Sequence, residues 1–289
     1  MFAKNKIFFY YLCSHNLVHD TMSAKKILFI TQEIYPYLAE STISTNCRYL
    51  PQAIQEKGKE IRTFMPKFGN INERRNQLHE VIRLSGMNLI IDDTDHPLII
   101  KVASIQAARM QVYFIDNEDF FSRKYTVEDE KGNEFADNDE RSIFYVRGVL
   151  ETIKKLRWIP DVIHCHGWMT ALTPLYIKTA FADDPCLKNS KVVYSLYDDG
   201  FKVPFSEEFK TKLRLQGIDD EHISDLNGDV DYVKLTNFAV KYSDGVVQCQ
   251  ENVNNSVLDY VASTETKFLP YLGNLGDSID AINNFYDNL

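Results

Sequence analysis

Residues 161–178, DVIHCHGWMTALTPLYIK, decide the fold class of this chain because they join a strand-like segment to a helix-like one. Residues 161–165 have the length and apolar character of a buried strand, whereas 168–180 have the spacing of a helix. A strand followed directly by a helix is the unit from which parallel sheets are built. The stretch therefore predicts an α/β protein.

The same alternation runs along the chain on both sides of this stretch. The further predicted strands are 25–31, 61–66, 191–196 and 245–249, and the further predicted helices are 42–57, 139–156, 206–215, 229–242 and 251–262. Segments 80–91, 97–104 and 110–116 alternate apolar and polar residues, which predicts short strands of a meander. Gly58 is the expected stop of the first helix, and Ser206 is an expected N-cap.

We therefore predict a single Rossmann-like domain with a doubly wound, mostly parallel sheet covered by helices on both faces. The composition fits this class: 44% of the 289 residues are hydrophobic and 25% are charged. The net charge is −9, and no cluster of Lys and Arg is present, which argues against nucleic acid as a partner. The five cysteines are dispersed without C-x-x-C spacing, which indicates reduced thiols and a cytoplasmic location.

The N-terminal residues are interpreted separately from the domain. The apolar run 7–13 is too short to span a bilayer, and no small-residue cleavage site follows it, so no membrane association is expected. Met22 begins the segment that leads into the first strand. We therefore expect residues 1–21 to be an extension from an over-extended start, and 22–289 to form the domain.

Candidate site residues follow the strands, because ligands of a parallel sheet bind beyond the C-terminal ends of its strands. Three such corners stand out: 31–44, 164–169 and 195–200. The first corner lacks the glycine-rich turn that brings backbone N–H groups to a phosphate, and it carries an acid, Glu40. An anionic nucleotide would be repelled there unless another segment supplied a cation.

The second corner holds His164, Cys165 and His166. Alternate residues of a strand share one face, so the two histidines point away from the cysteine, which disfavours a catalytic Cys–His pair. No third ligand with suitable spacing completes a zinc site, so we expect no metal. Two interpretations stay open: histidines hydrogen-bonded at the strand end beside a packed cysteine, or a histidine that faces a ligand.

The order of these corners resembles the N-terminal lobe of bacterial glycogen synthases and plant starch synthases. Residues 25–69 are similar to the opening of that family, which passes from a strand through S-E-x-x-P and K-T-G-G-L to L-P-x-x-L. Residues 137–153 resemble its D-N-x-x-R-F-x-x-F helix, and 160–178 its P-D-V-V-H-x-H-D-W-x-x-x-L-x-P segment. The likeness covers roughly residues 25–262.

The resemblance implies a GT-B glycosyltransferase, with two Rossmann-like lobes around a cleft. Such enzymes transfer glucose from ADP-glucose (or UDP-glucose) to an α-1,4-glucan and need no metal or other cofactor. The resemblance also implies that these 289 residues carry the acceptor-side lobe alone. The second glycosyltransferase lobe, which holds most nucleotide-sugar contacts in the family, is expected to be absent.

The first corner departs from the family pattern at its phosphate-binding motif. The family's K-T-G-G falls on Ala39, Glu40, Ser41 and Thr42, so a lysine and two glycines are replaced by neutral or acidic residues. Losing a cation and gaining a carboxylate reverses the local charge. The positions that match the family are Glu33, Pro36, Arg141, His164, His166 and Trp168.

The other two corners also depart from the pattern. The aspartate of H-x-H-D-W falls on Gly167, which has the alternative explanation that a glycine permits the turn. The histidine and asparagine of T-x-H-N fall on Tyr197 and Asp198. Packing in the emptied cleft and contact with a ligand both stay open for Tyr197.

We therefore predict a non-catalytic relative that binds a sugar, a nucleotide or a partner protein, with an ADP-sugar and an α-glucan as candidate ligands. One alternative is a half-enzyme completed by a second glycosyltransferase lobe from another chain or a homodimer. Another is a domain recruited to a different reaction through Tyr197, Asp198 and Asp199. No catalytic residue is expected, and the candidate ligand-binding residues are Glu33, Glu40, Ser41, Thr42, His164, His166, Gly167, Trp168, Tyr197 and Asp198.

Overall fold

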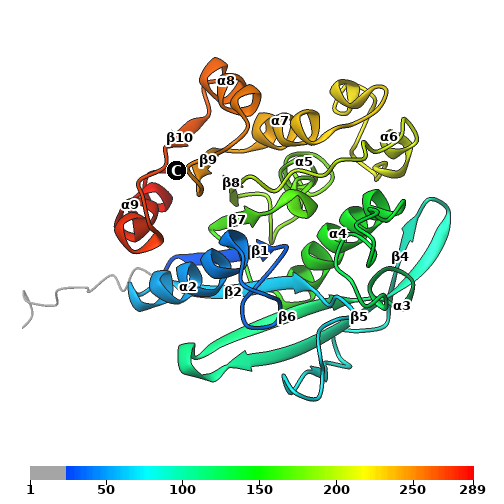
Figure 1. The fold of residues 1–289 in the computed structure, drawn as a ribbon, viewed down its shortest axis with the longest axis horizontal. Coiled ribbons are helices and arrows are strands. Elements are labelled where there is room, and N and C mark those ends of the chain that lie inside the picture. Colours follow the sequence, from blue (N-terminus) through cyan, green and yellow to red (C-terminus); the bar gives the residue numbers. More distant parts are fainter. Residues whose placement is uncertain (1–23) are drawn as a thin grey trace, which may run out of the picture.

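The computed structural model describes residues 24–289 and shows one large sheet with helices on both faces (Figure 1). The expected extension 1–21, with Cys13, lies outside the described residues. The strands are β1 Lys26–Thr31, β2 Glu60–Pro66, β3 His79–Glu80, β4 Met87–Ile91, β5 Thr94–Ile105, β6 Met110–Asp116, β7 Val162–His166, β8 Lys191–Leu196, β9 Gly245–Gln248 and β10 Lys267–Leu269.

The helices alternate with these strands along the chain. They are α2 Thr42–Glu56, α3 Glu118–Phe121, α4 Asn138–Leu156, α5 Thr173–Lys178, α6 Phe209–Lys212, α7 Tyr232–Tyr242, α8 Asn255–Ser263 and α9 Leu275–Asp287, with short 3₁₀ turns at Gln106–Ala108, Trp168–Thr170 and Ser224–Leu226. Gly58 follows α2 with φ +90°, as expected of a residue that ends a helix.

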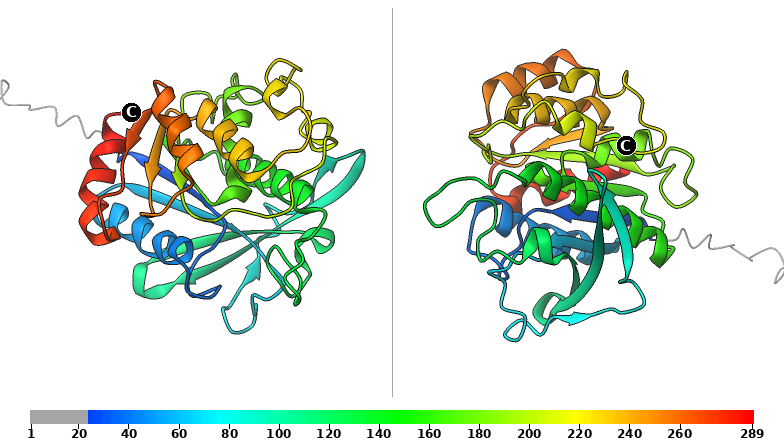
Figure 2. Two further views of the ribbon diagram at one scale, coloured as in Figure 1. Left: turned by 45° about the horizontal axis from the view of Figure 1, so that its top comes forward. Right: turned by 90° about the vertical axis from the view of Figure 1, so that its right-hand side faces the viewer.

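The sheet order is β10-β9-β8-β7-β1-β2-β6-β5-β3, with β4 paired to β5. All neighbours from β10 to β6 are parallel, whereas β5 pairs antiparallel with β6, β3 and β4. Figure 2 shows the long β4–β5 hairpin at one edge of the molecule. The prediction of a Rossmann-like, mostly parallel α/β fold is confirmed, and it includes the predicted meander.

Each central strand is buried on both faces because its residues alternate between two helical layers. Ile27 and Phe29 of β1 pack with α2 and α9, in a cluster that includes Tyr286. Leu28 and Ile30 pack in the larger cluster that α4, α5 and α7 cover. Figure 1 shows α2 and α9 beside each other on one side of the sheet. The sheet is therefore doubly wound.

Several elements differ from the sequence-based expectations. The helix expected at 206–215 shrinks to α6, and its N-cap is Glu208, so the prediction of Ser206 as the cap is wrong. The helix expected at 168–180 splits into a 3₁₀ turn and α5, because Thr170 bonds back to the carbonyl of Gly167 at 2.7 Å and closes a tight turn. Neither β10 nor α9 was predicted.

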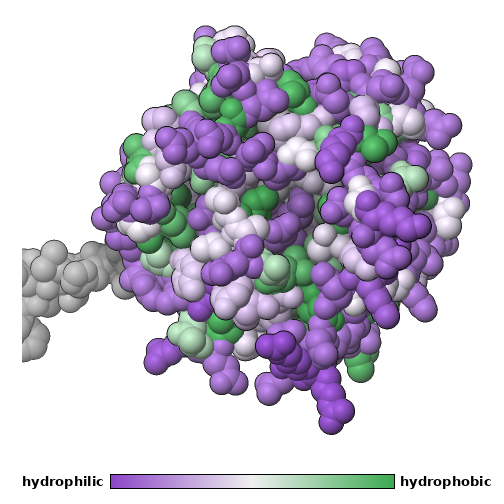
Figure 3. Space-filling model, in the orientation of Figure 1, coloured by the Kyte–Doolittle hydropathy of each residue, from purple (hydrophilic) through white to green (hydrophobic). Residues whose placement is uncertain are grey.

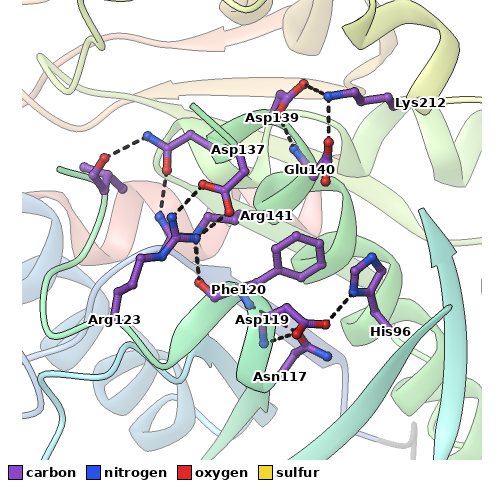
Figure 4. A network of polar contacts seen from close by, with 12 residues as sticks. His96, Asn117, Asp119, Phe120, Arg123, Asp137, Asp139, Glu140, Arg141 and Lys212 are labelled. Atoms are coloured by element: carbon purple, nitrogen blue, oxygen red, sulfur yellow. Dashed lines mark hydrogen bonds and ion pairs between the residues drawn. The ribbon is translucent and has the colours of Figure 1, made fainter. Parts of the chain in front are cut away.

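Arg141 of α4, which matches the family pattern, serves the fold. Its side chain is fully buried, and Nε donates to the carbonyl of Phe120 at 2.8 Å (Figure 4). The guanidinium lies 5.3 Å from the ring centroids of both Phe121 and Phe135. Burial lowers the pKa of Arg141 to about 9, so the group still carries its charge near neutral pH. Arg141 therefore ties α3 to the start of α4.

The surface shown in Figure 3 is mostly hydrophilic, with apolar residues in small groups. Within residues 24–289, the helices are too short or too polar for any of them to cross a bilayer. The four cysteines of this range, Cys47, Cys165, Cys186 and Cys249, are free thiols.

Candidate functional site

The three corners that the sequence singled out meet at a cavity of about 400 Å³ beyond the ends of β1, β7 and β8. Glu33, Ser41 and Thr42 line it from the first corner, and Trp168 lines it from the second. Asp198 and Asp199, with Phe201, line it from the third. The parallel strands bring these residues together because their carboxyl ends lie at one edge of the sheet.

Glu40 lies apart from this cavity. Together with Ser41 and Thr42 it lines a neighbouring open groove of about 670 Å³ between the N-terminal ends of α2 and α9. Ser41 caps α2, since its hydroxyl accepts from the backbone N–H of Ser44 at 3.0 Å. The first corner is therefore held by a helix cap in place of a glycine-rich turn.

Glu33 is the half-buried carboxylate of the first corner. The hydroxyl of Ser41 donates to its Oε2 at 2.6 Å. Burial nevertheless raises the pKa of Glu33, and this effect outweighs the opposing one of the hydrogen bond. Glu33 lines the cavity, and its bond to Ser41 ties it to the start of α2.

His164 and His166 face the same side of β7, as predicted, and their ring centroids lie 4.0 Å apart. Both are fully buried. The ring of His164 is hydrogen-bonded at both nitrogens, to the hydroxyl of Tyr286 at 2.6 Å and to that of Ser195 at 2.7 Å. Burial lowers the pKa of His164 far below its usual value and that of His166 to about 3. Both rings are therefore uncharged near neutral pH.

Tyr197 is almost fully buried and is not among the residues that line the cavity. Its hydroxyl lies 2.9 Å from Nδ1 of His166 and 3.5 Å from Nδ2 of Asn46. Such contacts with protein groups are what the packing interpretation of Tyr197 predicts. Nε2 of His166, in contrast, is buried and has no hydrogen-bond partner among residues 24–289. Direct ligand contact by Tyr197 and the two histidines remains a prediction.

Gly167 makes the turn after β7 with φ +88°, a conformation that side chains rarely tolerate. A Cβ atom at this position would lie 2.6 Å from Cβ and 2.9 Å from Oε1 of Gln32. Gln32 in turn accepts a hydrogen bond from the backbone N–H of Met169 at 3.1 Å. Gln32 therefore fills the space into which a side chain at 167 would project. No local sequence pattern predicts this contact, since Gln32 and Gly167 lie 135 positions apart in the chain.

Asp199 joins the second and third corners. Its Oδ2 accepts from the backbone N–H of Trp168 at 2.8 Å, and its Oδ1 lies 2.9 Å from the hydroxyl of Tyr232 on α7. Burial raises the pKa of Asp199 to about 6, and the charge of Glu33 adds to this shift. The sequence singled out Asp199 only as a polar group of a recruited domain and did not predict its bond to Trp168.

Within residues 24–289, no three His, Cys, Asp or Glu side chains converge in a way that could hold a metal ion. The aromatic wall of the cavity consists of Trp168 and Phe201, whose ring centroids lie 5.2 Å apart. The site therefore offers carboxylates together with two aromatic rings. Such a site can hydrogen-bond hydroxyl groups and cover the apolar face of a ligand.

Comparison with known proteins connects this geometry to one family. Residues 26–266 match the family model described as the starch synthase catalytic domain. The glycogen synthase of Chlorobium phaeobacteroides is 37% identical over 174 residues, which are 60% of this chain and 36% of the relative. That of Chlorobaculum tepidum is 33% identical over 235 residues, or 81% of this chain and 47% of the relative.

Among solved structures, the catalytic domain of starch synthase IV from Arabidopsis thaliana, bound to ADP and acarbose, is similar with a TM-score of 0.69. The match covers 89% of this chain and 53% of that chain at 19% identity, so it supports the fold alone. The matched part of this chain thus spans 36% of the length of the first glycogen synthase and 47% of the second.

Proposed function

Because the chain belongs to the family of starch synthase catalytic domains, we propose that it is an acceptor-side lobe that binds an α-glucan without transferring glucose on its own. The observation that carries this proposal is the Gln32 side chain beside Gly167. The Gln32 side chain occupies the space that the side chain of the family's aspartate, which falls on position 167, would need. An aspartate at 167 cannot be accommodated in this arrangement without moving Gln32.

The other corners support the same proposal. The histidine of the family's T-x-H-N is replaced by Tyr197, whose hydroxyl is turned inward to His166. The lysine and glycines of K-T-G-G are replaced by a segment in which Ser41 caps α2 and bonds Glu33. One preorganised electrostatic group is worth roughly 3–4 kcal/mol of transition-state stabilisation, so the loss of several removes most of the catalytic power.

The features that favour glucan binding are the carboxylates and the two aromatic rings of the cavity wall. Glu33 and Asp199 present acceptors for sugar hydroxyls, and Phe201 is a half-buried ring at the cavity wall. The solved starch synthase IV domain with ADP and acarbose bound adds support, since it shares the fold. An ADP-sugar is the second candidate ligand and is weighed against the glucan below.

Isothermal titration calorimetry with maltoheptaose tests the binding. We expect saturable binding by the wild-type chain and at least fivefold weaker binding by Phe201→Ala, because its ring lines the cavity. Tyr125→Ala is the matched control, since Tyr125 is exposed and lies outside the cavity lining. Absence of binding, or equal weakening by the two substitutions, would refute the proposal.

A half-enzyme completed by a second lobe is the alternative that one observation favours. That observation is the match of Glu33, His164, His166 and Trp168 to the family pattern. Affinity purification of the tagged chain from its own cells, followed by mass spectrometry, tests it. A stoichiometric second glycosyltransferase lobe that restores transfer would support the half-enzyme, and recovery of the chain alone would count against it.

A further inference from the structure

Three hydrogen-bond donors of the residues that line the cavity are bonded to carboxylates of the same lining. The backbone N–H of Trp168 donates to Asp199 at 2.8 Å, and the hydroxyl of Ser41 donates to Glu33 at 2.6 Å. The backbone N–H of Lys202 donates to Glu134 at 2.9 Å. In each case the acceptor is a carboxylate that also lines the cavity. These three donors are thus already bonded to anions of the chain itself.

The charge of the lining residues has the same consequence. Five carboxylates line the cavity against one cation, Lys202. The acids are Glu33, Glu128, Glu134, Asp198 and Asp199. Two unit charges of like sign repel each other strongly in a partly desolvated cavity, where the effective dielectric constant is low. A phosphate would therefore meet repulsion from these carboxylates and would find the three donors named above already bonded.

Asp199 contributes both to the internal use of donors and to the negative charge of the cavity wall. It occupies the Trp168 N–H, and it is coupled to Glu33 across the cavity. The groups that face it are Glu33 from the first corner, Tyr232 from α7 and Tyr194 from β8, with Asp198 next to it in the chain. None of these groups supplies a positive charge that would neutralise Asp199.

The two contacts of the Tyr232 hydroxyl depend on whether Asp199 is protonated. The Tyr232 hydroxyl lies 2.8 Å from the carbonyl of Tyr197 and 2.9 Å from Oδ1 of Asp199. A tyrosine hydroxyl has one hydrogen, so it can donate to one of these two acceptors only. Both contacts are hydrogen bonds at once if a protonated Asp199 donates to Tyr232 and Tyr232 donates to Tyr197. When Asp199 is ionised, Tyr232 can donate to Oδ1 instead, and this bond opposes the larger effect by which burial raises the pKa of Asp199.

We propose that Asp199 excludes phosphate-bearing ligands from the cavity and thereby restricts it to uncharged, hydroxyl-bearing ligands. This inference rests on the proposed glucan-binding function and selects the glucan over the ADP-sugar as its ligand. Protonation of Asp199 removes the charge, so the exclusion weakens as the pH falls through about 6, the pKa to which burial raises this group.

Calorimetric titration with ADP tests the inference on the full chain. Asp199→Asn keeps the shape and an acceptor for the Trp168 N–H while it removes the charge. We expect Asp199→Asn to raise ADP affinity at pH 7.5 at least fivefold. Asp259→Asn, on the exposed surface of α8, controls for net charge and should change ADP affinity less than twofold. Asp198→Asn, which removes a charge from the same wall without a bond to Trp168, should give a smaller gain than Asp199→Asn.

The pH dependence supplies the second readout. Wild-type affinity for ADP should rise at least about fourfold more between pH 8.0 and 5.5 than that of Asp199→Asn, since most of Asp199 is protonated at pH 5.5 when its pKa is about 6. The ionisation of ADP itself is common to both proteins, so the difference between them belongs to Asp199. Equal gains for Asp199→Asn and Asp259→Asn, parallel pH dependences, or no ADP binding by any variant would each overturn the inference.

A separate titration with maltoheptaose distinguishes this inference from the proposed function. Failure of the wild-type chain to bind maltoheptaose refutes glucan binding, whereas the comparison of Asp199→Asn with Asp259→Asn still decides whether Asp199 excludes phosphate. Maltoheptaose binding without a specific ADP gain in Asp199→Asn would leave the function standing and remove the role of Asp199.

Discussion

Gln32 and Gly167 are in steric contact across the first and second corners: a Cβ atom on residue 167 would lie 2.6 Å from Cβ of Gln32. The two residues come from the ends of β1 and β7, which are neighbours in the sheet. Their contact explains in physical terms why this corner holds a glycine. It also couples the identity of residue 167 to that of residue 32.

We predict that Gly167→Ala lowers the free energy of unfolding by about 2–4 kcal/mol, because backbone strain at positive φ adds to overpacking against Gln32. Gly58→Ala is the matched control, since Gly58 has a similar φ of +90° but nothing within 4 Å of its Cβ position. It should cost only about 1–2 kcal/mol. In a Gln32→Gly background, Gly167→Ala should cost at least about 1 kcal/mol less than in the wild type. Urea unfolding of the two alanine variants, of Gln32→Gly and of the double variant measures these free energies. Equal losses of stability for Gly167→Ala and Gly58→Ala would contradict the steric explanation.

The hydrogen bond between Tyr286 of α9 and His164 of β7 gives the second prediction. Tyr286→Phe should destabilise the protein by about 1–3 kcal/mol, because it leaves a buried ring nitrogen of His164 without its partner at 2.6 Å. Tyr125→Phe, at an exposed hydroxyl, should change stability by less than about 0.5 kcal/mol. Chemical unfolding measures both, and equal effects of the two substitutions would show that α9 is not anchored through this bond.

The pH dependence of stability gives the third prediction. Burial holds the pKa values of His164 and His166 below their unfolded value of 6.5, so the unfolded chain binds more protons as the pH falls below 6.5. Stability should therefore fall between pH 6.5 and 5, by up to about 1.4 kcal/mol per pH unit for each ring.

Asp199 acts in the opposite sense. Because its pKa is raised to about 6 from 3.8, its contribution to stability is complete below pH 3.8 and is lost as the pH rises through 6. Asp199→Asn should then lose stability more steeply than the wild type between pH 6 and 5. Thermal unfolding at a series of pH values measures both slopes, and stability that rises toward pH 5 in the variant would contradict the burial of neutral histidines.

Much of the architecture could be predicted because strand and helix periods are local signals. The expected strands at 25–31 and 191–196 lie within one residue of β1 and β8. The expected helix at 206–215 failed because its cap and its apolar spacing did not override the packing of a short segment around Phe209. α9 carried a usable signal, since Leu275, Ile279, Ile282 and Tyr286 share a helical face.

The site was predictable only in part. That the three corners converge follows from the parallel sheet, and the facing of His164 and His166 follows from strand alternation. The bond from Trp168 to Asp199 and the packing of Gln32 on Gly167 depend on the order and register of β1, β7 and β8. Sequence patterns leave that register undetermined, because the partners lie far apart in the chain.

Transfer of glucose by the purified chain is the most direct test of whether the lobe binds without catalysing. The chain would be incubated with radiolabelled ADP-glucose and glycogen, and label in the precipitated glucan would be counted against a full-length glycogen synthase and a no-protein blank. We predict incorporation at the level of the blank, even at a glucan concentration that saturates binding. Label that accumulates with time and with the amount of chain would contradict the proposal.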